Sequence, residues 1–247
     1  MQDWHIAITG GSKGIGAATA NTLARQAVHL HLMARNQPKL DEFSRSLNAK
    51  AYSIDLAKPE QIAHVMRSIG ESSGGRLDGL VINAAKYGMS SYQDLTPEMF
   101  RAYLDTNLVA SLELVRCAAP LLKAGQGKSI VMVSSTLALR PVPGTAAYAA
   151  SKAGLNNLVR CLALELAAES IRVNAVLPGV VDTEIHDPQR VSDPSRSEKM
   201  TQLAPLHPLG RVGTAQDVAN MIEFLLSPKS SWMTGSCITV DGGISVA

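Results

Sequence analysis

The feature that most constrains the fold is a regular alternation of short apolar runs with longer amphipathic stretches. The runs predict strands at residues 4–9, 28–33, 51–54, 80–83, 129–133, 172–176 and 237–240. The stretches between them predict helices near 15–27, 38–47, 59–70, 97–123, 147–168 and 214–227. This order is typical of an α/β domain with a parallel sheet and helices on both faces. We expect a single domain over residues 1–247, with a doubly wound sheet of about seven strands.

Composition excludes several classes of protein. The 247 residues are 46% hydrophobic and 18% charged, which allows a large buried core. The net charge of +2, without a basic block, gives no indication of nucleic-acid binding. No apolar run reaches about 18 residues, so we expect no membrane span. The N-terminal residues lack the pattern of a signal peptide, so we expect none. No His, Cys or carboxylate cluster has metal-ligand spacing, so we expect no metal site. The three cysteines are widely spaced and fit a reducing compartment, so we expect a cytoplasmic location.

A glycine turn follows the first predicted strand and opens a helix. In Thr9-Gly10-Gly11-Ser12-Lys13-Gly14-Ile15-Gly16, Gly10 allows a tight turn, Gly14 a close backbone approach and Gly16 tight helix–strand packing. The N-terminus of the helix then presents backbone N–H groups and the positive end of its dipole to a pyrophosphate. The sequence therefore predicts dinucleotide binding at residues 10–16.

The same segment also matches the nucleophile elbow of α/β-hydrolases. Gly10-Gly11-Ser12-Lys13-Gly14 has the Gly-x-Ser-x-Gly pattern, and Asp182 and His207 follow it in the chain. That elbow requires an oxyanion-hole loop from earlier strands, but only one strand precedes this site. The hydrolase interpretation also leaves Gly16 unexplained, so we favour the dinucleotide site.

The end of the second predicted strand indicates which dinucleotide binds. NAD sites usually carry an acidic residue here that accepts the ribose 2′-hydroxyl. This chain has Ala34 and Arg35 instead, and Lys13 lies in the glycine turn. A guanidinium can bind a 2′-phosphate through two hydrogen bonds and stack on adenine. We therefore predict NADP(H) rather than NAD(H).

Tyr148 and Lys152 are four residues apart in an Ala-rich stretch that predicts a helix, so they share one helix face. A fixed ammonium beside a phenol favours the phenolate and lowers its pKa toward the working range of an acid–base catalyst. Taken alone, the pair is better explained as a Tyr and a Lys on a solvated helix face. The interpretation depends on the motifs around it.

Together these motifs resemble the short-chain dehydrogenase/reductase family, in particular bacterial 3-oxoacyl-carrier-protein reductase-like members. The resemblance covers the whole chain, through the glycine turn, Asp55-Leu56, Asn83-Ala84-Ala85, Asn107, and Ser135 thirteen residues before Tyr148. It continues through the segments Pro178-Gly179-Val180-Val181-Asp182-Thr183 and Val240-Asp241-Gly242-Gly243. It implies a Rossmann domain with a catalytic set of Asn107, Ser135, Tyr148 and Lys152. The cofactor contacts that it implies are Gly10, Ser12, Lys13, Gly14, Ile15, Gly16, Arg35, Asp55, Leu56, Asn83, Ala84, Tyr148, Lys152, Pro178, Gly179, Val181 and Thr183.

The resemblance implies hydride transfer between the nicotinamide C4 and a carbonyl or secondary-alcohol substrate. Tyr148 is then the general acid/base, Lys152 lowers the pKa of Tyr148 and bonds the nicotinamide ribose, and Ser135 bonds the substrate oxygen. Asn107 holds a water that links Lys152 to solvent. One departure is Ala85, where the family usually has glycine. Two alternatives stay open: a nucleotide-binding regulatory protein, and an epimerase or dehydratase on the same scaffold.

The segment 184–212 is expected to be an irregular cover over the substrate. It contains His186 and His207, which we interpret as surface or loop histidines. The expected pocket walls are Leu137, Val142, Thr145 and Tyr87. The helices near 97–123 and 147–168 are apolar on more than one face, which indicates a second buried contact. The resemblance implies that this contact forms a homodimer or homotetramer.

Overall fold

The computed structural model describes residues 1–184 and 194–247, with only the backbone described at 194–197 and 199. In this part of the chain, seven parallel strands form one sheet in the order β3-β2-β1-β4-β5-β6-β7. The strands are β1 (Trp4–Thr9), β2 (Val28–Ala34), β3 (Lys50–Ser53), β4 (Gly79–Ile82), β5 (Ser129–Val133), β6 (Arg172–Pro178) and β7 (Cys237–Val240). The strand order reverses between β1 and β4. The predicted doubly wound fold is therefore confirmed, and ligands bind outside such a reversal point in open α/β sheets.

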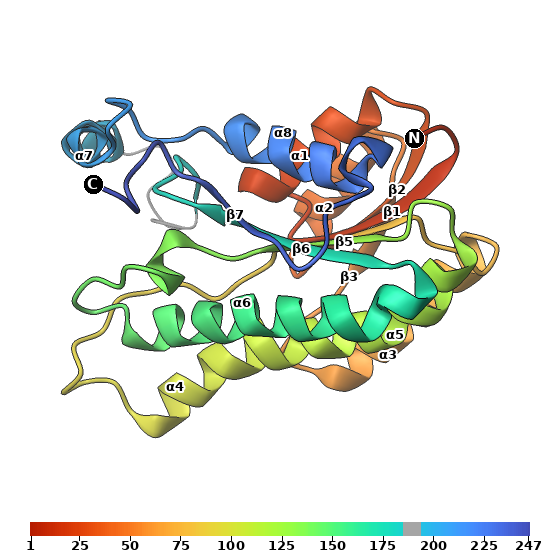
Figure 1. The fold of residues 1–247 in the computed structure, drawn as a ribbon, viewed down its shortest axis with the longest axis horizontal. Coiled ribbons are helices and arrows are strands. Elements are labelled where there is room, and N and C mark those ends of the chain that lie inside the picture. The colour runs from red at the N-terminus through yellow and green to blue at the C-terminus, as the bar shows by residue number, and fades with distance from the viewer. Residues whose placement is uncertain (185–193) are drawn as a thin grey trace.

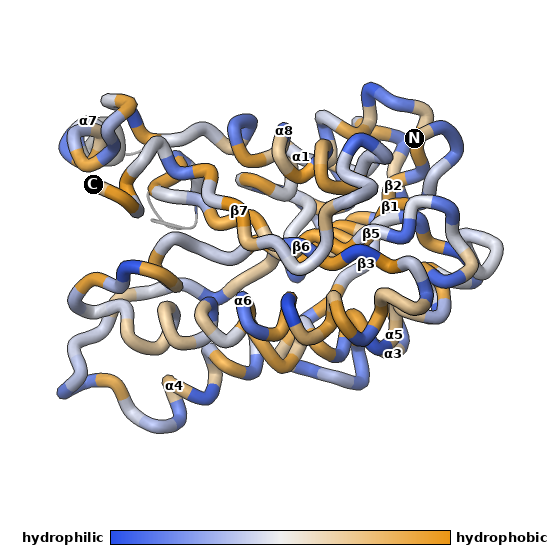
Figure 2. Tube along the Cα trace, in the orientation of Figure 1, coloured by the Kyte–Doolittle hydropathy of each residue, from blue (hydrophilic) through white to orange (hydrophobic). Residues whose placement is uncertain are grey.

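Helices cover both faces of the sheet (Figure 1). One layer contains α3 (Pro59–Ser72), α4 (Pro97–Leu104), α5 (Ala110–Ala124) and α6 (Ala146–Leu166). The other contains α1 (Gly14–Ala24), α2 (Gln37–Ser46) and α8 (Ala215–Leu226). A buried apolar cluster lies between the sheet and each layer. The central strands are the most hydrophobic part of the chain (Figure 2), as expected for parallel strands that are buried on both faces.

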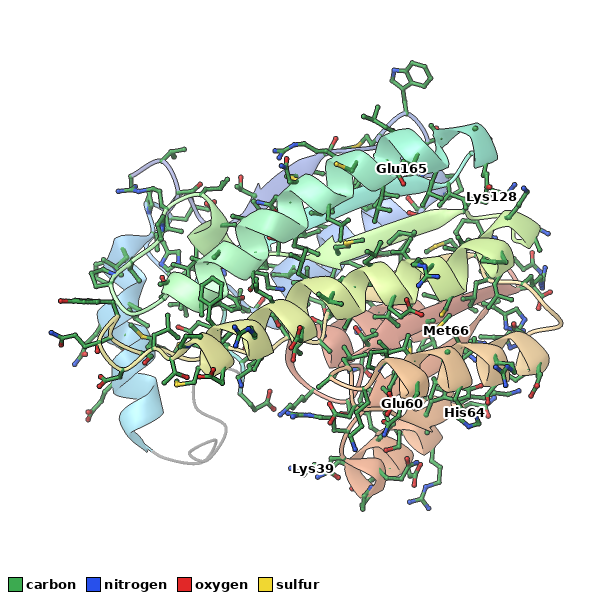
Figure 3. All side chains as sticks on the ribbon, turned by 90° about the horizontal axis from the view of Figure 1, so that it is seen from below. Lys39, Glu60, His64, Met66, Lys128 and Glu165 are labelled. Atoms are coloured by element: carbon green, nitrogen blue, oxygen red, sulfur yellow. The ribbon has the colours of Figure 1, made fainter. Side chains whose placement is uncertain are left out.

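The amphipathic pattern explains how the helices pack. From below, α6, α5 and α3 lie side by side under the sheet (Figure 3). On α3, Glu60 and His64 are exposed while Met66 is buried against the sheet. No helix in the described residues is both long and apolar enough to span a bilayer.

The structure differs from the predicted elements in two places. The stretch predicted as one helix over 97–123 is α4 followed by a π-helical turn, Asp105–Val109, and then α5. The segment predicted to be irregular contains a helix, α7 (Pro194–Leu203), followed by a 3₁₀ turn, Ala204–Leu206. Residues 185–193, including His186, lie outside the described residues.

Both ends of α8 are satisfied by hydrogen bonds, which fixes the helix beside β6. At its start, the Thr214 hydroxyl accepts from the Asp217 amide at 3.2 Å, and the Asp217 carboxylate accepts from the Thr214 amide at 2.8 Å. At its end, Arg172 on β6 donates to the carbonyls of Leu225 at 3.0 Å and Leu226 at 3.3 Å. A guanidinium is well suited to the unpaired carbonyls of a helix C-terminus.

Candidate active site

The glycine turn has the geometry of a phosphate cradle. Gly10 has φ of 65° and Gly14 has φ of 53°, a region that favours glycine. A Cβ at Gly16 would lie 2.2 Å from the Gly10 carbonyl oxygen, so only glycine fits there. The first turn of α1 carries no acidic side chain, and its N-cap residue Lys13 makes no side-chain cap. The structure describes every residue of α1. With no acidic side chain in its first turn, the backbone amides at the N-terminus of this helix suit a pyrophosphate.

Asn83 holds this turn from the neighbouring strand. Its side-chain nitrogen donates to the carbonyls of Thr9 at 3.0 Å and Gly10 at 3.4 Å. In return, the Thr9 hydroxyl accepts from the backbone amides of Asn83 at 2.9 Å and Ala84 at 3.0 Å. The predicted cofactor residues Asn83 and Ala84 thus brace the glycine turn through β4. Ala85, which follows them, is half-buried.

The loop after β6 meets the glycine turn from the other side. Thr183 is buried, and a Cβ at Gly14 would lie 3.3 Å from its side chain. Val181 pairs with Gly213 as an isolated bridge, and Gly179 packs against Asp241. Pro178 is the last residue of β6. Thr183 therefore contacts the glycine turn at Gly14, and the backbone of that turn has a geometry that fits a dinucleotide.

The cations predicted to select the nucleotide lie at the adjacent strand ends. The Gly11 amide donates to the Met33 carbonyl at 3.2 Å, which places Arg35 just beyond the turn. Arg35 and Lys13 are both exposed. After β3, the Asp55 carboxylate accepts from the Ala57 amide at 3.1 Å, and Leu56 is buried. These side chains share the carboxyl edge of the sheet with the glycine turn.

Tyr148 and Ser135 meet at the center of the same edge. Tyr148, in the first turn of α6, is 7% exposed, and Ser135, just after β5, is 8% exposed. Ser135 lies close enough to the Tyr148 hydroxyl to lower its pKa. The Ser135 hydroxyl also accepts from the Leu137 amide at 3.1 Å, which fixes its position. The two hydroxyl side chains thus lie near each other at this edge of the sheet.

Lys152 lies one turn further along α6 and is 3% exposed. Its ammonium nitrogen is 5.8 Å from the center of the Tyr148 ring. The same nitrogen donates to the Val133 carbonyl at 2.7 Å, at the end of β5. The Ser134 hydroxyl donates to the Lys152 carbonyl at 3.3 Å. The predicted pair therefore faces the sheet, and a solvated helix face is excluded.

Asn107 is the buried residue of the π-helical turn. Its amide oxygen accepts from the Lys86 amide at 2.8 Å, and its amide nitrogen donates to the Lys86 carbonyl at 3.0 Å and to the Ser151 hydroxyl at 2.9 Å. The Ser151 hydroxyl donates to the Tyr148 carbonyl at 2.7 Å. Asn107 therefore connects α6 to the loop after β4. Helical bulges of this kind occur frequently at functional sites.

Burial, rather than the neighbouring cation, controls the acidity of the pair. Burial raises the pKa of Tyr148, and the hydrogen bond from Ser135 offsets this only in part. Burial also lowers the pKa of Lys152 to about 7. The predicted lowering of the Tyr148 pKa is therefore wrong for this structure. The physical reason is that desolvation penalises both charged forms, while the Lys152 ammonium is directed at the Val133 carbonyl.

An apolar wall lies beside Tyr148. The ring of Tyr87 meets the ring of Tyr148 edge to face, with centers 4.9 Å apart. Tyr87 and Leu137 pack against the buried cluster that includes Tyr148. Val142 is 48% exposed, and Thr145 is buried and bonded to the Val142 carbonyl at 2.7 Å. Of the four predicted wall residues, Tyr87 and Leu137 thus lie directly beside the hydroxyl pair.

Sequence reasoning missed three residues that organise the site. Ser151 and the Lys86 backbone are the partners of Asn107, and the i+3 spacing of Ser151 from Tyr148 was the available signal. His207, predicted as a surface or loop histidine, is buried and bonded on both ring nitrogens. In the described residues, no three His, Cys, Asp or Glu side chains form a group that could hold a metal.

The sequence has relatives across most of its length. A sequence model of the family described as enoyl-(acyl carrier protein) reductase matches residues 10–245. A tropinone reductase homolog from Arabidopsis thaliana is 36% identical over 245 residues, which are 97% of this chain and 89% of the relative. A tropinone reductase homolog from Datura stramonium is 34% identical over 244 residues, covering 97% and 91%.

Solved structures match the whole fold. The NADPH-bound short chain oxidoreductase from Pseudomonas aeruginosa, described as containing an atypical catalytic center, superimposes with a TM-score of 0.91. It is 31% identical, and the match covers 100% of both chains. The ligand-free aldohexose dehydrogenase from Thermoplasma acidophilum gives a TM-score of 0.90 at 28% identity, covering 100% of this chain and 95% of the other.

Proposed function

The chain belongs to the short-chain dehydrogenase/reductase family of oxidoreductases, and we propose that it is an NADP(H)-dependent enzyme that interconverts a carbonyl compound and a secondary alcohol. The observation that carries this proposal is the neighbouring pair of buried hydroxyl side chains, Ser135 and Tyr148, beside the buried Lys152. The pair lies at the same sheet edge as a glycine cradle that fits a dinucleotide.

The bound nicotinamide supplies the hydride, and the protein supplies the proton and the positioning. In the reduction direction, Tyr148 donates its proton to the substrate oxygen, and its raised pKa keeps the hydroxyl protonated for this role. The Ser135 hydroxyl donates a hydrogen bond to the same oxygen and stabilises the charge that develops there. Lys152 replenishes the proton, which its lowered pKa favours near neutral pH.

The preference for NADP(H) rests on Arg35 and Lys13. Both side chains are exposed cations beside the glycine turn, and β2 ends in Ala34 where a carboxylate would otherwise accept a ribose hydroxyl. A guanidinium forms two strong hydrogen bonds with a phosphate. The remaining cofactor contacts are those predicted at the glycine turn, Asp55, Leu56, Asn83, Ala84 and the loop after β6.

The substrate side of the site is apolar near the hydroxyl pair. Tyr87 and Leu137 present ring and aliphatic surface there. We therefore propose small carbonyl compounds with an uncharged, apolar body. A substrate cover formed by the segment 184–212 stays a prediction, and its residues 185–193 lie outside the described part of the chain.

The test follows the loss of reduced-nicotinamide absorbance with a panel of apolar ketones and aldehydes. Wild type is expected to oxidise NADPH with at least one of them. Tyr148→Phe keeps the ring and its packing but removes the donor, so kcat is expected to fall by about 10²–10⁴ while NADPH affinity stays unchanged. If both proteins bind NADPH and neither reacts with any carbonyl, a regulatory nucleotide-binding protein is the better interpretation. Turnover of a substrate without net NADPH loss favours an epimerase or dehydratase.

We also propose that residues 1–247 form one cytoplasmic Rossmann domain that assembles as a homodimer or homotetramer through α5 and α6. Leu112 on α5 is 39% exposed and Leu164 on α6 is 81% exposed, and Cys161 on α6 is exposed as well. Large apolar side chains on two neighbouring helices favour a symmetric contact. The molar mass of wild type, measured by light scattering after gel filtration, is expected to be that of a dimer or tetramer. Leu164→Glu is expected to lower it toward the mass of the monomer. A monomeric wild type would contradict the proposed assembly.

A further inference from the structure

His207 connects the loop after β6 to the segment that follows α7. It comes directly after the 3₁₀ turn Ala204–Leu206 and is only 2% exposed. Its Nε2 accepts from the Val180 amide at 3.3 Å. Its Nδ1 lies 3.1 Å from the Leu203 carbonyl. One ring thus bonds the backbone on both sides of the connection.

The two partners determine the state of the ring. The Val180 amide can only donate, so Nε2 must carry a lone pair. The Leu203 carbonyl can only accept, so Nδ1 must carry the proton. The two bonds therefore use Nε2 as the acceptor and Nδ1 as the donor. An aliphatic side chain of similar size fills the space but satisfies neither partner.

Val180 depends on this segment for both of its backbone hydrogen bonds. Its amide donates to His207, and its carbonyl accepts from the Gly213 amide at 2.8 Å. The Asp182 amide donates to the Gly213 carbonyl at 2.9 Å. Hydrogen bonds from the segment 203–213 therefore hold the backbone of residues 180–182.

The same loop lines the cradle. Val181, next to Val180, is buried, and Thr183 packs against Gly14 of the glycine turn. Gly242 packs on the other side of His207, where an added Cβ would lie 3.3 Å from the histidine Cβ. The backbone of Val180, Leu203 and Gly242 thus contacts His207 from three sides of the connection.

We propose that His207 is a positioning residue for the cofactor: through Nε2 it holds the Val180 amide, and thereby fixes the 180–183 loop against the glycine turn that is proposed to bind the dinucleotide. The inference rests on the proposed function, because it takes the cradle to bind a nicotinamide cofactor. Removing the acceptor leaves a half-buried amide unpaired and frees the loop.

Two near-isosteric variants separate the bonds of His207. In His207→Gln the amide oxygen can occupy the place of Nε2 and accept from Val180. In His207→Asn the amide nitrogen can occupy the place of Nδ1 and donate to Leu203, but nothing accepts from Val180. His207→Leu loses both bonds. Each variant is measured for NADPH affinity by fluorescence titration, for amide exchange in the peptide containing Val180, and for thermal unfolding.

The expected result is that Asn and Leu weaken NADPH binding by about 3- to 30-fold, while Gln stays within about twofold of wild type. Amide exchange at Val180 is expected to accelerate in Asn and Leu and to be restored in Gln. Equal weakening in Gln and Asn, or binding that follows the loss of thermal stability in all three, overturns the inference. If wild type binds neither NADPH nor NADH, the proposed function fails and this inference falls with it; if wild type binds and all variants bind alike, only the inference fails.

Discussion

The proposed catalytic end of the site and its proposed nucleotide-selecting end differ in how strongly burial and hydrogen bonds fix their side chains. Asn107, Ser135, Tyr148 and Lys152 are all buried, and Asn107 and Lys152 each make a hydrogen bond to a distant part of the fold. Arg35 and Lys13 are exposed at the ends of β2 and β1. The proposed catalytic side chains are therefore placed by folding, whereas the two exposed cations can adjust to the ligand that they are proposed to bind.

This difference separates two kinds of mutational effect. A substitution at the catalytic end changes the free energy of unfolding together with activity, because buried polar groups lose their partners. A substitution at the selecting end changes which ligand binds and leaves the fold intact, because exposed side chains contribute little to stability. The predictions below test this separation.

The largest effect on stability is expected for Asn107→Leu. The change leaves the Lys86 amide, the Lys86 carbonyl and the Ser151 hydroxyl without their buried partner. We expect the free energy of unfolding to fall by about 2–5 kcal/mol in urea denaturation. Asn220→Leu, on the exposed side of α8, is the matched control and should change it by about 0.5 kcal/mol or less. A similar small change in both variants would show that the π-helical turn does not depend on Asn107.

Lys152→Met is expected to abolish activity yet raise stability near neutral pH. Burial lowers the Lys152 pKa from 10.5 to about 7, so between these values the unfolded chain binds a proton that the folded chain does not. Wild-type stability therefore rises with pH across that window, and the full cost of burying the charge applies below about pH 7. At pH 7 the free energy of unfolding of Lys152→Met should exceed that of wild type by about 1–3 kcal/mol, once the loss of the bond to Val133 is subtracted. This difference should vanish by pH 10.5.

Denaturation curves of wild type and Lys152→Met at several pH values measure this difference. The informative quantity is the sign of the change in this stability difference with pH, because the lost bond to Val133 shifts the difference without setting that sign. A difference that stays constant from pH 7 to 10 would mean that the buried ammonium keeps its ordinary pKa.

Arg35→Asp is expected to leave stability unchanged and to alter only cofactor choice. Losing the guanidinium removes the bond to the 2′-phosphate, and the new carboxylate can accept a ribose hydroxyl instead. We expect the ratio of NADH to NADPH affinity to rise by about 10- to 100-fold, with the free energy of unfolding within about 0.5 kcal/mol of wild type. Arg25→Asp, after the end of α1, serves as a charge-matched control. An unchanged affinity ratio would remove Arg35 from the nucleotide site.

Much of this fold follows from local sequence patterns. β1, β5 and β7 have the predicted bounds, because apolar runs bounded by turn residues leave little choice of strand. Gly16 was predictable because its spacing from Gly10 already implies close backbone packing. Tyr148 and Lys152 share a face because helix geometry dictates it.

The remaining features depend on contacts between distant segments. The π-helical turn at 105–109 forms around the bonds of Asn107 to Lys86 and Ser151, which no local pattern contains. α7 forms in a segment rich in Pro, Ser and Arg, whose composition alone indicated a loop. The burial of His207 and the raised pKa of Tyr148 both follow from packing that sequence spacing does not reveal.

The most direct test is a single turnover with NADPH that carries deuterium at both C4 positions, comparing wild type with Tyr148→Phe on a ketone that wild type accepts. The account predicts deuterium at the carbinol carbon of the product in wild type. It predicts a rate lower by about 10²–10⁴ in Tyr148→Phe, with NADPH bound equally well by both. A product without deuterium, or equal rates in the two proteins, would contradict hydride transfer with Tyr148 as the proton donor.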